Sequence, residues 1–239
     1  MLVWILAAVS AYFVKGLCGF ANTLVFTSIL SFAHNNILIT PVDLLLGFPA
    51  NVVMVWRGRK EIQWKVCLPM MALMLAGNIP GAIFLKNADS RWIKLIFGAV
   101  IVLLGAEMLL REMGKTKKMK ENKAVLTLIG LASGILSGLY GVGALLGVYI
   151  SRVTADTRDF KTNISLIFLS DNVFRFILYL CTGLITWESC RLFLILLPFA
   201  GLGMLLGMKS EKLLPEKIIR RLVILLLILS GLMLIVKAL

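Results

Sequence analysis

A short polar stretch beginning at Lys15, "KGLCGFANTL", interrupts an otherwise apolar run near the start of the sequence. Lys15 carries a positive charge, and Asn22 and Thr23 carry side-chain hydrogen-bond donors. The glycines Gly16 and Gly19 have no side-chain carbon, so a ligand can approach the backbone closely there. A positive charge, side-chain donors and accessible backbone amides are what a small anion binds. The stretch is therefore a candidate anion site.

Arg175 is the one basic residue deep within an apolar segment, in "SDNVFRFILYLC". Arginine presents parallel N–H donors to forked oxyanions, so Arg175 is a candidate anchor for an anionic substrate. Asp171 lies four residues earlier, on the same face of a helix. An alternative is that Asp171 neutralises Arg175 and the pair only holds helices together. A third interpretation makes the substrate compete with Asp171 for Arg175, which would gate the site.

The second half of the sequence contains a similar glycine-rich stretch, "SGLYGVGALLG". Ser137 and Tyr140 offer side-chain donors there, and the glycines that would expose the backbone are Gly138, Gly141 and Gly143. Close helix packing is an equal alternative for these glycines, because several follow GxxxG spacing. Two asparagines inside apolar segments, Asn51 and Asn172, either reach the site or join neighbouring helices by hydrogen bonds.

Other polar residues have structural interpretations. Asp43 follows Thr40-Pro41, which predicts a helix beginning with Thr40 as N-cap and Asp43 as a capping acid. The four cysteines form no CxxC pair and are interpreted as packing thiols. No cluster of histidine, cysteine and carboxylate suggests a metal site, and no cofactor is expected.

The composition identifies the setting of these residues. The chain has 239 residues, of which 60% are hydrophobic, and its mean hydropathy is +0.96. Its apolar runs are continuous rather than alternating, which predicts an all-α polytopic membrane protein and excludes a β-barrel. We expect ten apolar segments, at residues 2–14, 17–33, 41–56, 66–85, 92–110, 124–137, 139–151, 162–182, 192–208 and 218–236.

The segments form two similar halves, residues 1–110 and 124–239, joined by the basic linker 111–123. Matching features recur in the same order, including "KGLCG" with "SGLYG" and the two mid-segment asparagines. An odd number of segments in each half turns the second copy upside down in the membrane. We therefore expect two inverted repeats of about five helical segments each.

The distribution of charge predicts the orientation. The net charge is +13, but the cations gather in short loops rather than in a basic stripe with exposed aromatics, so nucleic-acid binding is excluded. Most of the 25 Lys and Arg residues fall on the side of the linker. By the positive-inside rule that side is cytoplasmic, and both termini face outside. Met1 has no basic region before the first apolar segment, so no cleaved signal peptide is expected.

Three segments, 2–14, 124–137 and 139–151, have only 13 or 14 residues. A helix of that length covers about 20 Å of a hydrocarbon core of about 30 Å. We therefore expect broken or re-entrant helices that meet near the middle of the membrane. Their free N–H groups and positive dipole ends favour anionic substrates.

Together, the twofold repeat, the breaks "GLCGFA" and "GLYGVG", the asparagines Asn51 and Asn172, and Pro69 followed by Gly77-xxx-Gly81 resemble the TauE/SafE sulfite exporter family. That family is also called the toluene sulfonate uptake permease family. The resemblance implies transport of small sulfur-containing anions such as sulfite, thiosulfate, sulfonates or sulfoacetate. Ala21 occupies a place where the family usually has a denser run of glycines.

The expected function is thus a multi-pass transporter in the cell membrane, with a small anion and the lipid bilayer as partners. An anion channel or a transporter of small carboxylates would use the same kind of site. An intramembrane enzyme is disfavoured, because the single histidine, His34, lies at a predicted surface and no nucleophile motif is found. The identity of the anion, the direction of transport, the coupling ion and assembly into a homo-oligomer stay open.

Overall fold

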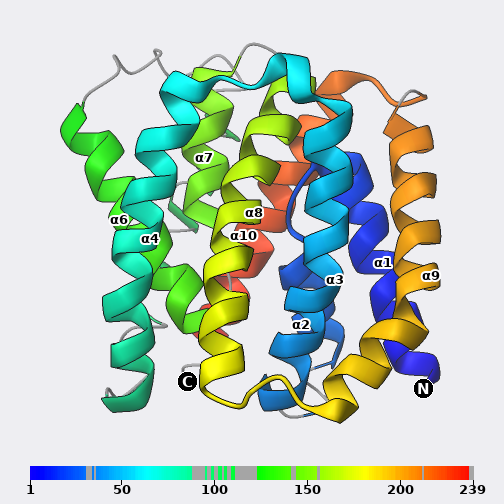
Figure 1. Cartoon of the computed structure of the whole chain (residues 1–239). Coiled ribbons are helices and arrows are strands. Elements are labelled where there is room, and N and C mark those ends of the chain that lie inside the picture. Colours follow the sequence, from blue (N-terminus) through cyan, green and yellow to red (C-terminus); the bar gives the residue numbers. More distant parts are fainter. Residues whose placement is uncertain are drawn as a thin grey trace.

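The computed structural model describes residues 1–30, 34, 36–87, 95, 98, 99, 102, 103, 105, 106, 109, 110, 123–140, 144–154, 157–211 and 213–236. Every regular element that these residues form is a helix, and none is a strand (Figure 1). The all-α fold class is therefore confirmed. Most of the linker 111–123, together with Gly141 and Gly143, lies outside the described residues.

Each α-helix overlaps one of the expected apolar segments, although several bounds differ by a few residues. In chain order they are α1 (Leu2–Cys18), α2 (Asn22–Leu30), α3 (Asn36–Arg57), the 3₁₀ turn η1 (Arg59–Glu61), α4 (Trp64–Asn87), α6 (Lys123–Tyr140), α7 (Ala144–Val153), α8 (Thr157–Cys181), α9 (Trp187–Glu211) and α10 (Glu216–Val236). The described residues of the segment 92–110 are also helical.

Several of these helices are long and apolar enough to cross a membrane. Within the described residues they are Leu38–Arg57, Thr157–Cys181 and Trp187–Glu211. A helix of 20 to 25 residues covers the hydrocarbon core, and these three have 20, 25 and 25 residues. The chain is therefore a polytopic helical membrane protein.

The break in the first segment comes later than the sequence predicts. α1 continues through Lys15 and Gly16 and ends at Gly19, whose φ of 86° is left-handed. The Gly19 N–H donates to the Lys15 carbonyl at 2.7 Å, which closes the last turn. Ala21 also has a positive φ, 69°, so the chain reverses sharply before α2. The predicted turn at residues 15–16 is wrong, because Gly16 has a packing role inside the helix.

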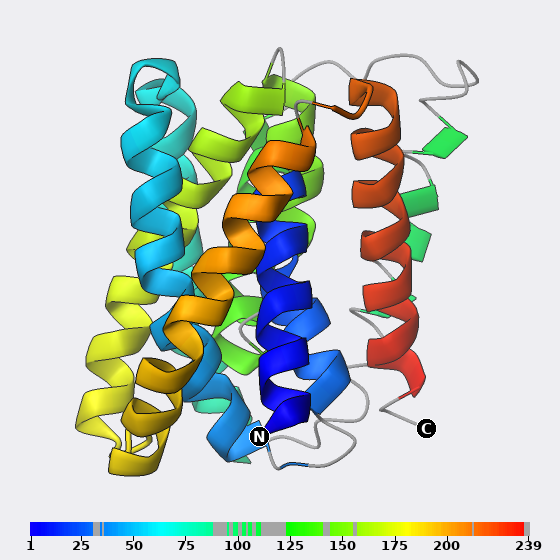
Figure 2. The same cartoon turned by 90° about the vertical axis from the view of Figure 1, so that its right-hand side faces the viewer.

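Two helix pairs form the most extensive contacts, α1 with α9 and α4 with α6. α3 and α8 pack against each other between these pairs (Figure 1). The N-terminus and the end of α10 lie at the lower end of the bundle (Figure 2). The connections α3–α4 and α9–α10 lie at the upper end in both views.

Glycines allow the paired helices to touch backbone to backbone. On α9, Gly207 contacts the Phe13 carbonyl of α1, and a Cβ there would lie 2.9 Å from the Leu17 nitrogen. Across the other pair, Gly77 of α4 lies against the Gly134 Cα of α6. Such contacts replace the hydrophobic driving force, which is absent between helices in lipid.

A buried lysine ties the upper end of α8 to this frame. The Lys161 ammonium donates to the Gly16 carbonyl at 3.1 Å and pairs with the Glu211 carboxylate at 2.7 Å. One side chain therefore joins α8, α1 and α9 beside the α1 break. The Lys161 stem also packs against Gly19, where a Cβ would collide with it.

Replacing Gly207 by alanine is expected to lower the free energy of unfolding by about 1–3 kcal/mol, because its methyl group would overlap the α1 backbone. Gly201→Ala on the same helix is the matched control, since nothing lies within 4 Å of its Cβ position. The control should be neutral or slightly stabilising, because alanine favours a helix over glycine. Thermal unfolding in detergent measures both, and equal effects would contradict the close packing of α1 and α9.

Candidate functional site

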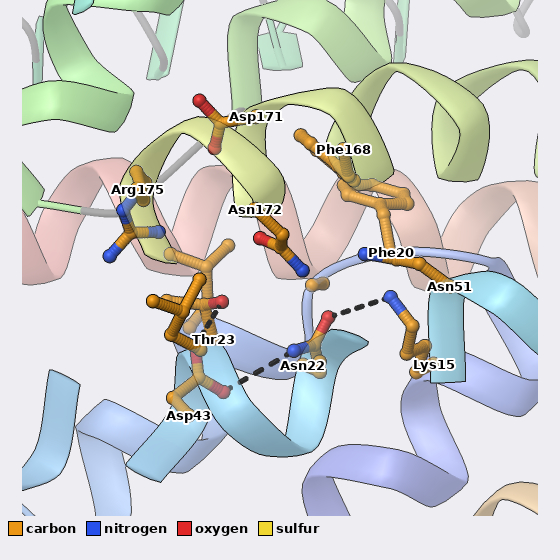
Figure 3. Close-up of a pocket in the computed structure, with 14 residues that line it drawn as sticks. Lys15, Phe20, Asn22, Thr23, Asp43, Asn51, Phe168, Asp171, Asn172 and Arg175 are labelled. Atoms are coloured by element: carbon orange, nitrogen blue, oxygen red, sulfur yellow. Dashed lines mark hydrogen bonds between the residues drawn. The ribbon is translucent and has the colours of Figure 1, made fainter. Parts of the chain in front are cut away.

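A polar cavity of about 40 Å³ lies where the α1–α2 break meets α3 and α8 (Figure 3). This volume holds a few water molecules or one small solute. The described residues that line the cavity come from both halves of the chain: Lys15, Phe20, Ala21, Asn22, Thr23, Leu24, Asp43, Leu44, Gly47, Asn51, Phe168, Asp171, Asn172 and Arg175. Charged groups at this depth in a membrane protein indicate a functional site.

Lys15 and Asp43 are joined through one asparagine on the first half of the site. The Lys15 ammonium donates to Asn22 Oδ1 at 3.2 Å, and Asn22 Nδ2 donates to Asp43 Oδ1 at 3.3 Å (Figure 3). The Thr23 hydroxyl donates to the other carboxylate oxygen of Asp43 at 2.6 Å. The α1 break is what permits this, because it brings the first turn of α2 back alongside α1 and α3.

The capping role expected for Asp43 is wrong. α3 begins at Asn36, so Thr40 and Pro41 lie inside the helix and Asp43 is in its second turn. The side chain is buried and faces the cavity. The sequence holds one signal that points to this residue. Asp43 is the only acidic residue before Glu61, within a long apolar region.

Arg175 is buried on the opposite side of the cavity. Its Nη2 donates to the Tyr179 hydroxyl at 2.9 Å, and the guanidinium lies over the Tyr179 ring at 5.2 Å. Its Nε is buried and has no hydrogen-bond partner. An unpaired N–H on a buried cation is costly, so this atom calls for an acceptor that the described residues do not supply.

The ion pair between Asp171 and Arg175, which one of the interpretations of the sequence required, is not formed. The Asp171 carboxylate accepts instead from the Ser137 hydroxyl at 2.6 Å and from the Asn78 amide, which donates to its other oxygen. In Figure 3 Asp171 is turned away from the Lys15 side of the cavity. The four-residue spacing placed the two side chains on one helix face, but α4 and α6 supply better-placed donors for the carboxylate.

The asparagines Asn51 and Asn172 both line the cavity. Asn51 Oδ1 is buried without a hydrogen-bond partner, and Asn172 lies close to Gly47, where a Cβ would come within 3.3 Å of Asn172 Nδ2. The glycine at position 47 therefore leaves space for the amide of Asn172.

The other predicted site residues lie elsewhere. Gly16 and Gly19 contact α9 and Lys161 rather than the cavity. Ser137 does not line the cavity and reaches it only through Asp171. Gly138 is inside α6, and the side chain of Tyr140 is not among those that the structure describes. Among the described residues, the second half contributes to the cavity through α8.

The cavity offers hydrogen-bond donors to a small anion, beside the carboxylates of Asp43 and Asp171. Two buried cations, Lys15 and Arg175, face it from different helices. The first residues of α2, Asn22 and Thr23, add the positive end of a helix dipole. The described residues contain no group of His, Cys, Asp and Glu that could hold a metal ion.

Comparison with known protein families decides the identity of this architecture. The model of the family "Sulfite exporter TauE/SafE" matches residues 4–234, nearly the whole chain. The chain belongs to the TauE/SafE family. No curated protein and no solved structure matches it. As a TauE/SafE protein it is a membrane protein of a sulfur-anion transporter family, in agreement with its apolar helices.

Removing the Ser137 hydroxyl should destabilise this TauE/SafE protein, because one oxygen of the buried Asp171 carboxylate loses its donor. We expect Ser137→Ala to lower the free energy of unfolding by about 1–3 kcal/mol. Ser133→Ala, one turn away on α6, is the matched control. Its buried hydroxyl has no hydrogen-bond partner among the described residues, so its loss should cost little. Thermal unfolding of the two variants gives the comparison, and a larger loss for Ser133→Ala would exclude the Asp171 contact as a stabilising one.

Proposed function

We propose that the protein transports small sulfur-containing anions, of the sulfite, thiosulfate, sulfonate or sulfoacetate type, through the cavity between its two halves. Family membership supports the substrate class. The observation that carries the site assignment is the unpaired Nε of Arg175, on a buried cation that lines the cavity. An oxyanion supplies the missing acceptor and can bond two guanidinium N–H groups at once.

Lys15 would hold the same anion from the other side. Its ammonium has three N–H donors and makes one hydrogen bond to a described side chain, that of Asn22. The remaining donors are available to a ligand. Asn51 and Asn172 line the same cavity and would supply or orient neutral contacts, while Asn22 and Thr23 fix the first turn of α2.

The inverted-repeat architecture is part of this proposal. If the two halves are equivalent, α1 corresponds to α6 and α9 corresponds to α4. The α1–α9 pair then corresponds to the α6–α4 pair, and among the described residues these two pairs form the most extensive helix contacts. α3 and α8 would then occupy equivalent places and meet at the centre. Figure 1 shows α1 starting at the lower end and α6 at the upper end, which agrees with opposite orientations of the repeats. Residues 1–110 and 124–239 would be the two repeats.

The substitution Arg175→Gln should weaken anion binding by about tenfold to a hundredfold, because it removes a charge-assisted contact worth roughly 1.5–3 kcal/mol. Thermal shift of the purified protein measures this with sulfite, thiosulfate, sulfoacetate, taurine, sulfate and short carboxylates. An anion at a hundred times its dissociation constant stabilises the protein by about 2.7 kcal/mol.

Arg158→Gln is the matched control on the same helix. Arg158 pairs with Glu61 at the upper end of α8, and its side chain is 68% exposed, so anion binding should persist. An Arg175→Gln protein that folds and binds as well as the wild type would overturn the anchor role. A thermal shift with carboxylates alone would favour a carboxylate transporter. The absence of a shift with every anion would contradict the proposed function.

Orientation in the membrane gives a separate prediction. With the cationic upper end in the cytoplasm and both termini outside, the exposed Cys181 at the lower end should react with an impermeant maleimide on intact cells. In a background without Cys181 and Cys190, Arg59→Cys and Lys117→Cys should react only after permeabilisation. Cys18 and Cys67 are buried and should stay unlabelled. Labelling of position 59 or 117 from outside would show that the topology is the reverse of the predicted one.

A further inference from the structure

Four buried charges surround the cavity, and their signs cancel. Lys15 and Arg175 are 1% and 4% exposed, and Asp43 and Asp171 are 4% and 2% exposed. When all four are ionised, the lining of the cavity is formally neutral. A monoanion that enters alone would leave one uncompensated negative charge among groups shielded from water, which is unfavourable. The cavity offers hydrogen-bond donors to an anion, but its neutral lining does not compensate the negative charge of that anion.

The two carboxylates differ in how they are held. Asp171 accepts from Asn78 and Ser137, which belong to α4 and α6 and lie outside the lining of the cavity. Asp43 accepts from Asn22 and Thr23, which line the cavity themselves. Its surroundings therefore change when a ligand enters, whereas those of Asp171 need not.

Asp43 is also the carboxylate that restrains both cations. Lys15 and Arg175 both act on it electrostatically, although no ion pair joins either of them to it among the described residues. Lys15 reaches it only through Asn22. A proton on Asp43 would remove its attraction from both cations, while Asp171 would still act on Arg175. The protonated carboxyl would in addition offer an O–H donor.

We propose that Asp43 binds one proton for each anion that enters the cavity, so that the anion and the proton cross the membrane together. This rests on the proposed anion transport. The proton passes from water to a carboxylate oxygen of Asp43, the anion then occupies the cationic side, and both leave on the opposite face. One positive and one negative charge move together, so the transport step is electroneutral.

The groups around Asp43 support this assignment. α1 contributes Tyr12, whose hydroxyl donates to the Asp43 carbonyl at 3.5 Å, and Lys15. α8 contributes Asp171, Arg175 and Tyr179, while α2 contributes the neutral Asn22 and Thr23. α9 also packs against α3, and its titratable residues lie toward its two ends: Glu188, Cys190, Arg191, Lys209 and Glu211. No other carboxylate lines the cavity within the described residues besides Asp43 and Asp171.

Proton uptake by the wild-type protein is the first test. Methanesulfonate is the probe, because a sulfonate keeps its single negative charge from mildly acidic to mildly alkaline pH. Adding it to purified protein in weakly buffered detergent, with a pH-sensitive dye, should remove about one proton from solution per bound anion. By linkage, affinity should then fall about tenfold for each unit of pH above the range in which free Asp43 holds its proton. Binding without proton uptake at any pH would overturn the proposal while leaving anion transport intact.

Asp43→Asn is the second test, because asparagine has the shape and neutrality of the protonated acid. At mildly acidic pH its affinity should be independent of pH and should match the acidic limit of the wild type. Glu188→Gln, which removes an exposed carboxylate outside the lining of the cavity, is the control and should keep the pH slope. In proteoliposomes a pH gradient should concentrate methanesulfonate in the wild type and not in Asp43→Asn. A pH slope that persists in Asp43→Asn would overturn the role of Asp43.

A third arm separates this inference from the proposed function. If methanesulfonate and every other sulfur anion fail to bind at all pH values, the proposed function fails and the inference fails with it. If binding requires Na⁺ in place of a proton, transport stands and the proton is replaced as the neutralising ion. Uptake that responds to membrane voltage but not to the pH gradient would likewise exclude an electroneutral step.

Discussion

The burial of the Lys15 ammonium is the constraint on which this structure depends. A charge at this depth must be surrounded by acceptors, since lipid supplies none. Asn22 meets part of this need, and it can do so only because the chain reverses at Gly19 and Ala21 and returns as α2. The same asparagine then fixes Asp43 on α3. One charge thus explains the break in α1, the start of α2 and the position of a carboxylate in a third helix.

Around this polar centre the helices form a rigid frame. Glycine contacts bring α1 against α9 and α4 against α6 with little space between their backbones. The Lys161 side chain holds the upper end of α8 to the α1–α9 pair. The cavity lies where the α1–α2 break meets α3 and α8, and these are the elements that carry its charged side chains.

Much of this arrangement could be predicted from the sequence. Continuous apolar runs indicated the helices, and the isolated charges Lys15 and Arg175 indicated residues of the cavity. The errors came from local patterns overridden by distant partners. Thr40-Pro41 resembles a helix start, but α3 begins a turn earlier and buries Asp43 against α2. The spacing of Asp171 and Arg175 suggested an ion pair, but Ser137 and Asn78 are far away in sequence and no local rule brings them to Asp171.

The pairing of α1 with α9 has a consequence for biosynthesis. α1 leaves the ribosome well before α9, so α1 enters the bilayer with Lys15 in place and without its main packing partner. The buried surfaces of the first half have no packing partners until the second half has been translated. Truncated chains that end before α9 would therefore present a lysine-bearing helix to the lipid or to the insertion machinery. Membrane proteases that degrade incomplete chains would recognise this exposed helix by its charge.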